Sequence, residues 1–357
     1  MRQLAPKLTY PVFLIDDLSE LLSWIKEQPF SGIRILADEN TAQFCVPKFH
    51  RKFADNEQFK IISGEHNKTL EACVPVWTWL GDTLTSRNHC LLNVGGGVVG
   101  DLGGFVAATF KRGVPFIQVP TTLLAMVDAS VGGKVGIDFR HYKNQIGAFA
   151  HPKSVFIFPG FLETLPIREL RAGLAEIIKH HLIADKDAFF NLIETPEEEI
   201  NLIQLIEHSI KTKASIVLQD EQEQSIRKVL NLGHTVGHAL ESYFLAHHPE
   251  QSLLHGEAVA VGIIAEAYLA YVMKLISPTE LDNIVSLILR YFVIPVWQSF
   301  EDEDIIQLMY HDKKNKSHTI LFVLLDGLGK ARIDIPVEKW LIMESLRFAQ
   351  SLRESEQ

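Results

Sequence analysis

The first third of the chain alternates short aliphatic runs with amphipathic stretches. The aliphatic runs are rich in β-branched residues and are bounded by polar or glycine-containing turns, which predicts strands, whereas the amphipathic stretches repeat their apolar positions with a helical period. The expected strands lie at residues 32–37, 59–63, 90–94, 116–120 and 155–158, and the expected helices at residues 18–26, 70–80 and 102–110. This alternation favours a Rossmann-like α/β arrangement, with a mostly parallel sheet covered by helices.

The pattern changes after Pro166. From there to Leu346 the apolar positions are mostly helical in period, and the period is interrupted at Pro196, Pro249, Pro278 and Pro295. Residues 319–325 are the exception and predict a strand, either in a hairpin or in a short pairing onto the helices. We therefore expect two domains: an α/β nucleotide-binding domain at residues 1–163 and a mainly α-helical domain for metal and substrate at residues 164–357.

Composition narrows the class of protein. The 357 residues are 47% hydrophobic and 22% charged, which is ordinary for a globular protein, and the formal net charge of −10 argues against nonspecific nucleic-acid binding. The three cysteines form no CxxC pair and fit buried apolar positions in a reducing compartment. The N-terminus lacks the apolar run of a signal peptide, so a cytoplasmic location is expected. Residues 258–276 are apolar, but Glu266 interrupts them, which favours a buried helix over a membrane span.

A glycine-rich turn follows the expected strand at residues 90–94 and opens a helix. Its residues are Gly95, Gly96, Gly97, Val98, Val99, Gly100 and Asp101. Glycine lets a backbone approach a ligand closely, and a helix start offers amide donors to a pyrophosphate. A tight turn without a ligand is the alternative, and because the spacing is not GxGxxG, a standard Rossmann unit is not expected.

Candidate phosphate contacts follow the next strand. Thr121 and Thr122 stand at its carboxyl end, where α/β folds bind ligands. The segment from Asp128 to Lys134 brings a glycine pair next to a lysine, and Lys143 with Asn144 adds another cation and an amide donor. A solvated lysine in a turn is the alternative for Lys134.

Three histidines indicate a metal site. His234 and His238 lie one helical turn apart, so both imidazoles can share a face, and His255 opens another apolar helix after a polar loop. Catalytic zinc takes three protein ligands and keeps one position open, and Glu176 is the best upstream carboxylate for such a set. The alternative is a group of capping and core histidines.

Six segments resemble the 3-dehydroquinate synthase family in order and spacing. They are GGGVVGDLGGF from Gly95, FKRGVPFIQVPTTLLAMVDASVGGK from Phe110, KNQIGAF from Lys143, AGLAEIIKH from Ala172, RKVLNLGHTVGHALE from Arg227 and LLHGEAVAVG from Leu253. The resemblance covers nearly the whole chain and is weakest in roughly the first 30 and last 30 residues.

The resemblance implies a carbon–oxygen lyase of the shikimate pathway, and hence of aromatic amino acid biosynthesis. The enzyme would convert 3-deoxy-D-arabino-heptulosonate 7-phosphate to 3-dehydroquinate and phosphate, with NAD and a zinc or cobalt ion as cofactors and a homodimer as the assembly. Two related functions are alternatives: a sister cyclase for sedoheptulose 7-phosphate and a metal-dependent polyol dehydrogenase. A catalytically inactive nucleotide-binding or scaffold protein is a third alternative, which would keep the glycine turn and lose the metal cluster.

The resemblance also implies roles for individual residues. The metal ligands would be Glu176, His234 and His255, and His238 would be a neighbouring substrate or proton-relay residue. The NAD contacts would be Asp38, Asn40, Glu65, Lys68, Gly95, Gly96, Gly97, Val98, Asp101, Thr121, Thr122, Lys143, Phe161, Thr164, Leu165 and Glu169. The substrate contacts would be Lys134, Asn144, Asn231 and Lys313 for the phosphate, Arg112 for the same phosphate from the other subunit, and Lys213 with Arg227 for the carboxylate. The catalytic set would be Asp128, Lys134, Lys179, Lys213, Glu223, Arg227, Asn231 and His238.

Spacing adds one geometric expectation. Arg227, Asn231 and His234 are about one helical turn apart in succession, so they are expected along one helix face, which would bring a cation beside the metal pocket. The alternative for Lys213 and Arg227 is a pair of solvated helix cations near Asp220, Glu221 or Glu223.

Two positions depart from the family pattern. His181 stands where the family often has a smaller residue, and Ser225 where glycine is common. Because neither residue is a proposed ligand, altered packing is expected rather than lost chemistry. The choice of Lys313 over Lys314 rests on position alone.

Overall fold

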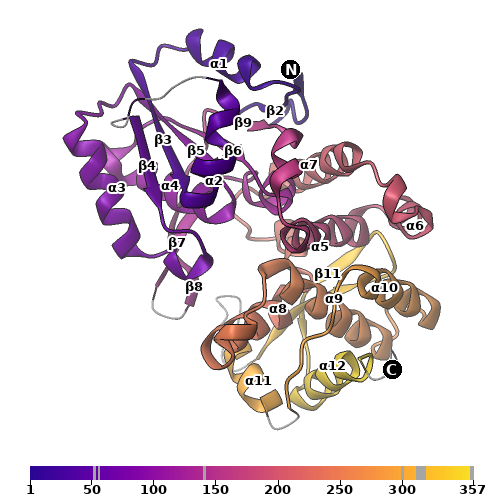
Figure 1. Ribbon diagram of the computed structural model, residues 1–357. Coiled ribbons are helices and arrows are strands. Elements are labelled where there is room, and N and C mark those ends of the chain that lie inside the picture. Colours follow the sequence, from indigo (N-terminus) through magenta and orange to yellow (C-terminus); the bar gives the residue numbers. More distant parts are fainter. Residues whose placement is uncertain (51–53, 55–56, 140–141, 299–300, 311–318, 354–357) are drawn as a thin grey trace. The chain divides into compact units, whose positions relative to one another are not determined.

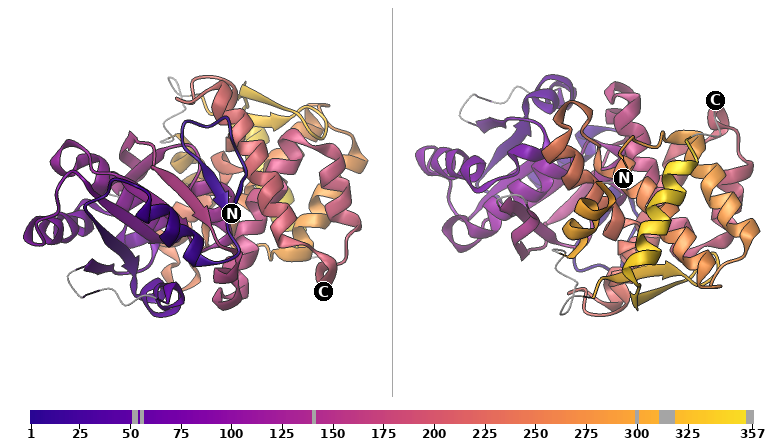
Figure 2. Two further views of the ribbon diagram at one scale, coloured as in Figure 1. Left: turned by 90° about the horizontal axis from the view of Figure 1, so that it is seen from above. Right: turned by 90° about the horizontal axis from the view of Figure 1, so that it is seen from below.

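The computed structural model describes residues 1–50, 54, 57–139, 142–298, 301–310 and 319–353 (Figures 1 and 2). Its contacts divide the chain into two compact units. The first comprises Met1–Leu170 with Ile206–Leu218, and the second comprises Arg171–Leu205 with Gln219–Gln357.

The first unit is built on a seven-stranded sheet in the order β1-β2-β9-β6-β5-β3-β4. All neighbouring strands are parallel except for the pair β1–β2. The strands are β1 (Arg2–Gln3), β2 (Val12–Leu14), β3 (Gly32–Asp38), β4 (Gln58–Ile61), β5 (His89–Gly95), β6 (Phe116–Pro120) and β9 (Ser154–Ile157). The helices of this unit are α1 (Leu18–Lys26), α2 (Glu39–Phe44), α3 (Leu70–Asp82), α4 (Gly97–Thr109) and most of α7 (Leu202–Gln219).

Helices pack on both faces of this sheet. On one face, a core cluster joins Leu36, Leu91 and Phe116 of the strands to Leu102 and Val106 of α4. On the other face, Trp24 of α1 packs edge-on against Phe156 of β9, with ring centroids 5.4 Å apart. The mostly parallel sheet with helical cover is therefore confirmed, and its near-continuous apolar strands follow from burial on both sides.

Two features of the first unit differ from the sequence expectation. The helix expected at residues 102–110 begins at Gly97, because the glycine-rich turn itself forms the first helical turn. A two-stranded antiparallel hairpin, β7 (Lys134–Phe139) with β8 (Tyr142–Phe149), was not expected. Its backbones meet closely where a Cβ on Gly136 would lie 2.7 Å from the carbonyl oxygen of Ile146.

The second unit is mainly helical, as predicted. Its helices are the larger part of α5 (Ile167–Ala184), α6 (Lys186–Glu194), α8 (His234–His247), α9 (His255–Val272), α10 (Pro278–Tyr291), α11 (Asp302–Tyr310) and α12 (Lys339–Ser351). The strand expected at residues 319–325 is β10 (Leu321–Leu325), and it pairs antiparallel with β11 (Ala331–Pro336). In the part of the chain that the structure describes, no helix is both long and apolar enough to cross a membrane.

Candidate functional site

Glycine packing in the second unit brings Glu176 and His255 together. Helix α9 begins at His255, and the next residue, Gly256, lies against α5, where a Cβ would be 1.9 Å from the carbonyl oxygen of Ala172. Glu176 follows Ala172 by about one turn of α5 and is fully buried. Because Gly256 has no side chain, the first turn of α9 can approach the turn of α5 that leads to Glu176.

A backbone break sets the start of α8. The 3₁₀ helix Ile226–Asn231 ends before Leu232, and Gly233 has a left-handed backbone with φ of 79°. Helix α8 then begins at His234 and places His238 one turn later. The expectation that Arg227, Asn231 and His234 share one helix face is therefore wrong, because the helix containing Arg227 and the helix containing His234 are separate elements.

Two imidazoles converge on one carboxylate oxygen. Nε2 of His234 and Nε2 of His255 each lie 3.7 Å from Oε1 of Glu176. The Nδ1 atoms face acceptors instead: that of His234 lies 3.1 Å from the carbonyl oxygen of Leu232, and that of His255 lies 3.3 Å from Oε2 of Glu241. A proton on each Nδ1 satisfies these acceptors, so a neutral imidazole at either position has its Nε2 lone pair available on the side of Glu176 for a cation.

This donor set fits a zinc-type ion. A tetrahedral ion with ligand bonds of about 2.1 Å holds its donor atoms about 3.4 Å apart. The two separations of 3.7 Å from Glu176 to His234 and His255 are close to that value. Imidazole nitrogen with carboxylate oxygen is a ligand combination of catalytic zinc, which keeps a further position open.

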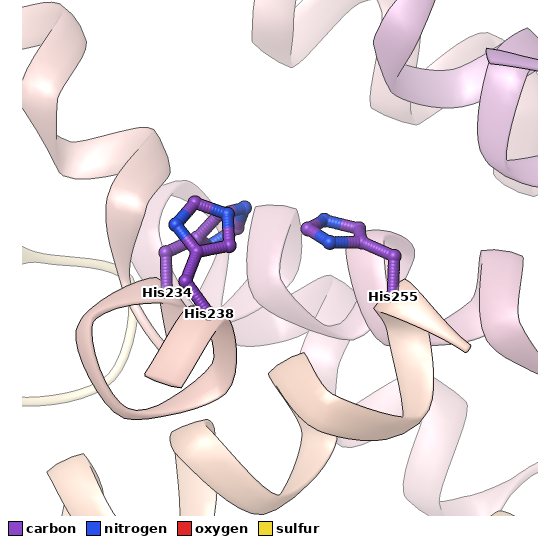
Figure 3. A group of neighbouring side chains, drawn as sticks. All are labelled: His234, His238 and His255. Atoms are coloured by element: carbon purple, nitrogen blue, oxygen red, sulfur yellow. The ribbon is translucent and has the colours of Figure 1, made fainter. Parts of the chain in front are cut away.

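His238 lies in the same group. Figure 3 shows His234 and His238 projecting from one helix with their rings directed toward His255 at the start of another. The ring centroid of His238 is 5.0 Å from that of His234 and 5.6 Å from that of His255, and ligand nitrogens of all three lie within 4.8 Å of one another. A set of three histidines is thus a second possible ligand combination beside the set that contains Glu176.

Nearby charges affect this cluster. Burial lowers the pKa of His255, but hydrogen bonds and charges of Glu176 and Glu241 outweigh burial and raise the pKa to about 9. The ammonium of Lys179 forms a close ion pair with Oε2 of Glu176, and both side chains are buried. A cation held against these carboxylates is stabilised even without access to water.

The glycine-rich turn in the first unit is a second candidate site. Gly96 is the N-cap of α4, and a Cβ on Gly96 would lie 3.1 Å from the side chain of Thr122. A small cavity lies beside this turn and is lined by Gly95, Gly96, Gly97, Pro120 and Ser130 among others. Glycine backbone, a helix start and a hydroxyl therefore meet at the carboxyl ends of β5 and β6, where α/β sheets bind ligands.

A buried lysine joins several predicted cofactor contacts. Nζ of Lys68 lies 2.7 Å from Glu65, 3.4 Å from Asp101 and 2.9 Å from Oδ1 of Asn144, and Lys143 lies 3.3 Å from Glu65. Burial lowers the pKa of Lys68, but the charges of its carboxylate neighbours outweigh burial and raise that pKa. Burial raises the pKa of Asp101 to about 6, against the opposing charge of Lys68. Asn144, expected at the substrate phosphate, belongs to the same network.

The other predicted cofactor contacts have local structural roles. Asp38 caps α2, whose second residue is Asn40. The amide of Thr121 donates to the carbonyl of Gly95, which ties the end of β6 to the glycine turn. Phe161 and Thr164 lie in a 3₁₀ helix that ends before Leu165, and Glu169 lies in the first turn of α5.

The predicted anion contacts fall into both units. In the first unit, Nζ of Lys213 lies 2.7 Å from Oδ1 of Asp128, in a π-helical turn, and Lys134 is exposed at the start of β7. In the second unit, Arg227 is 2% exposed and donates to the carbonyl of Glu221. Because Lys213 and Arg227 are both buried, the alternative of two solvated cations is wrong.

Two further predicted substrate residues contact each other in the second unit. The side-chain amide of Asn231 donates to Oε1 of Glu223 at 3.0 Å, so Glu223 orients the side chain of Asn231. Lys313 and Lys314 lie outside the described residues.

Two carboxylates that support the proposed metal site were not predicted from the sequence. Glu241 accepts from His255, and Glu266 accepts hydrogen bonds at the start of α8. Glu241 lies two helical turns after His234, a spacing that could have revealed it. The role of Glu266 depends on a contact between two helices, which the sequence does not show. The sequence shows only that a carboxylate interrupts an apolar segment.

Comparisons with known proteins show the family of this chain. Family profiles for the N-terminal and C-terminal domains of 3-dehydroquinate synthase match residues 58–172 and 173–315, respectively. A 3-dehydroquinate synthase from Parabacteroides distasonis is 40% identical over 344 residues, which cover 94% of this chain and 97% of that protein.

Two solved structures of other synthases share the fold. A 2-deoxy-scyllo-inosose synthase in complex with carbaglucose-6-phosphate, NAD⁺ and Co²⁺ has a TM-score of 0.82 at 25% identity, over 98% of this chain and 99% of that one. A 2-epi-5-epi-valiolone synthase from Streptomyces hygroscopicus subsp. jinggangensis with NAD⁺ and Zn²⁺ bound has the same TM-score and identity, over 97% and 98% of the two chains. By its profile matches and its identity to a named relative, the chain belongs to the 3-dehydroquinate synthase family.

Proposed function

We propose that the chain is a 3-dehydroquinate synthase, a lyase that converts 3-deoxy-D-arabino-heptulosonate 7-phosphate to 3-dehydroquinate and phosphate. The reaction combines a transient oxidation, loss of phosphate, re-reduction and an intramolecular aldol closure. The observation that carries the proposal is the convergence of His234 and His255 on one oxygen of Glu176, 3.7 Å from each, in a chain of this family. The enzyme acts in the cytoplasm, in the shikimate pathway, as a homodimer.

The cofactors are NAD and a zinc or cobalt ion. The metal is held by Glu176, His234 and His255, and NAD by the residues around the glycine-rich turn and Lys68. When bound, the ion supplies Lewis acidity toward substrate hydroxyls and NAD supplies a hydride acceptor that is restored within each turnover. The metal ligands all lie in the expected domain of residues 164–357, and most of the NAD contacts lie in the expected domain of residues 1–163.

The chain's own residues bind and orient the substrate. Lys134, Asn144, Asn231 and Lys313 bind the phosphate, and Lys213 with Arg227 binds the carboxylate. Asp128 and Lys179 contact ring hydroxyls, and His238 contacts the substrate or relays a proton. Charged groups that are fixed before the reaction stabilise developing charge without reorganisation, which is the main contribution the protein makes here.

The test is phosphate release from heptulosonate 7-phosphate by the metal- and NAD-loaded enzyme. Phosphate should accumulate while NADH absorbance stays constant, because the hydride returns to the substrate. The variant His234→Ala should lose metal and activity together. A well-folded His234→Ala protein with full metal content would refute the ligand set, and stoichiometric NADH formation would indicate a dehydrogenase instead.

The substrate carboxylate gives a second test. A charge-assisted hydrogen bond contributes roughly 1.5–3 kcal/mol, so Arg227→Met should lower kcat/KM for heptulosonate 7-phosphate by at least about tenfold. Turnover of sedoheptulose 7-phosphate, which has no carboxylate, should be slow and unaffected by Arg227→Met. Equal turnover of both sugars by the unmodified enzyme would favour the sister cyclase.

A further inference from the structure

A buried carboxylate lies in the most apolar helix of the second unit. Glu266 is fully buried in α9, whose other buried residues are glycine, alanine and aliphatic side chains. Its Oε2 accepts a hydrogen bond from the amide of Gly233 at 2.6 Å, and its Oε1 lies 3.4 Å from the amide of Val236. Because burial of a carboxylate is costly and an aliphatic residue would suit the packing of α9, these contacts point to a role outside α9 itself.

Glu266 acts as the cap of another helix. The first amides of a helix have no partners within it and are usually satisfied by the side chain of the N-cap residue. The N-cap of α8 is Gly233, which has no side chain. Glu266 supplies an acceptor from α9, and its position at the positive end of α8 is electrostatically favourable.

The cap joins the two helices that carry the predicted histidine ligands. Gly233 directly precedes His234, while α9 begins at His255, about three turns before Glu266. One turn before Glu266, the backbone of α9 touches the same place: a Cβ on Gly262 would lie 1.9 Å from the carbonyl oxygen of Gly233. Movement of the first turn of α8 relative to α9 would therefore break the contacts of Glu266 and change the distance between the two imidazoles.

We propose that Glu266 is a positioning residue for metal binding: it fixes the start of α8 so that His234 faces the same point as His255. This inference rests on the proposed ligand set and adds a residue that touches neither metal nor substrate. Residues that orient metal ligands from outside the ligand set commonly contribute 10–100-fold to metal affinity.

The test is the substitution Glu266→Gln. Glutamine keeps the shape but has one acceptor oxygen and an amide donor, so one of the two backbone amides of α8 loses its acceptor. Zn²⁺ affinity is measured by chelator competition on folded protein, and ligand geometry by the visible absorption of the Co²⁺ form. We expect Zn²⁺ affinity to fall by about tenfold or more and the Co²⁺ bands to shift.

The matched control removes an N-cap from a different helix of the same unit. Ser277 caps α10 by accepting from the amide of Glu280, and α10 carries none of the predicted ligands. Ser277→Ala should lower the melting temperature but leave the Zn²⁺ affinity and the Co²⁺ spectrum unchanged. Folding of Glu266→Gln is checked by comparing its circular dichroism spectrum with that of the unmodified chain. If the variant is not folded, Glu266→Asp is used instead, because aspartate keeps the charge but has a shorter side chain. The expected changes in Zn²⁺ affinity and Co²⁺ spectrum are the same.

The outcomes are distinguishable. Unchanged metal affinity and spectrum in folded Glu266→Gln, together with loss of metal in His234→Ala, would overturn the role of Glu266 and leave the ligand set standing. Retention of metal in His234→Ala would overturn the ligand set itself. A shift in the Co²⁺ spectrum of Ser277→Ala as large as that of Glu266→Gln would reduce Glu266 to a general stabilising contact.

Discussion

The two imidazoles proposed as metal ligands differ in the group that their Nδ1 atom contacts. His234 faces a backbone carbonyl, which no substitution removes, whereas His255 faces the carboxylate of Glu241 at 3.3 Å. A carboxylate on the far nitrogen fixes ring orientation and makes the imidazole a better donor. The contact of Glu241 with Nδ1 of His255 can therefore be tested by mutation.

Glu241→Gln should weaken Zn²⁺ binding by about 10–100-fold, because the amide oxygen is a weaker acceptor than a carboxylate for the proton on Nδ1 of His255. Chelator competition measures the affinity. The matched control is Glu250→Gln, which makes the same change at an exposed position and should leave the affinity unchanged. An affinity within twofold of the unmodified protein in Glu241→Gln would mean that the contact does not orient His255.

Asp101 predicts a pH dependence of stability. Its pKa is raised by burial from 3.8 to about 6, so the folded chain holds this proton after the unfolded chain has lost it. The contribution of Asp101 to stability is therefore greatest below about pH 4 and is lost as the pH rises through about 6. The loss is on the order of 2–3 kcal/mol for a shift of about two pKa units.

Asp101→Asn removes this titration. Relative to the unmodified protein, the variant should gain stability steadily between pH 4 and pH 6, which urea unfolding of the NAD-free protein at several pH values measures. Asp82→Asn makes the same substitution at an exposed position in the last turn of α3 and is the matched control. A pH-independent difference between Asp101→Asn and the unmodified protein would contradict the raised pKa.

Residue identity was easier to predict than residue partnership. The histidines, Glu176 and the glycine turn were recognisable because their chemistry and spacing are local. The contact of Lys68 with Asn144 joins residues 76 positions apart and depends on the β7–β8 hairpin, which was not expected. Sequence periodicity carries no information on such pairs, since it describes one element at a time.

At the scale of elements, boundaries were predictable where capping and period agree. Helix α1 begins and ends as predicted, with Asp17 and Glu20 forming a capping box before its apolar stripe. The break at Leu232 and Gly233 was missed, because Arg227, Asn231 and His234 keep a helical spacing across it. From the sequence, a glycine at this position is equally compatible with a helical backbone and with a left-handed backbone that ends the helix. Tertiary contacts with α9 determine which conformation forms.

Gly256 predicts a large effect from a small substitution. In Gly256→Ala, the new Cβ would lie 1.9 Å from the carbonyl oxygen of Ala172, so α5 and α9 must separate and carry Glu176 away from His255. We expect a loss of about 1–3 kcal/mol in unfolding free energy, with weaker Zn²⁺ binding and slower phosphate release. Denaturant unfolding and chelator competition measure the two effects.

The matched control for this prediction is Gly81→Ala. Gly81 lies near the end of α3, and a Cβ there would have no described atom within 4 Å. Alanine in a helix is favoured over glycine by roughly 0.5–1 kcal/mol, so this variant should be slightly stabilised with unchanged metal binding. Equal behaviour of Gly256→Ala and Gly81→Ala would show that the approach of α9 to α5 is not close.

At the scale of the whole molecule, the proposed homodimer rests on Arg112. The turn after α4 has three consecutive residues with positive φ: Lys111 at 51°, Arg112 at 64° and Gly113 at 113°. Non-glycine residues adopt this conformation at a cost, and such strain is often found at functional positions. Arg87 and Thr85 hold the turn through hydrogen bonds with Lys111. Among the residues that the structure describes, the side chain of Arg112 has no hydrogen bond or ion pair, and it is exposed.

The hydrogen bonds of Lys111 hold the turn in place, and the exposed guanidinium of Arg112 is available to bind a phosphate in another subunit. Arginine binds phosphate through two parallel hydrogen bonds. Arg112→Ala and Lys134→Ala chains should each be inactive alone. In a mixed dimer, the site with an intact Lys134 receives the intact Arg112 of its partner, so one of the two sites should recover. A mixture of Lys134→Ala with Arg227→Met should not recover, because Lys134 and Arg227 are both proposed to serve the site of their own chain. Absence of recovery in mixed dimers verified by native mass spectrometry would place Arg112 in its own chain's site. Recovery in both mixtures would point to exchange of larger segments between subunits.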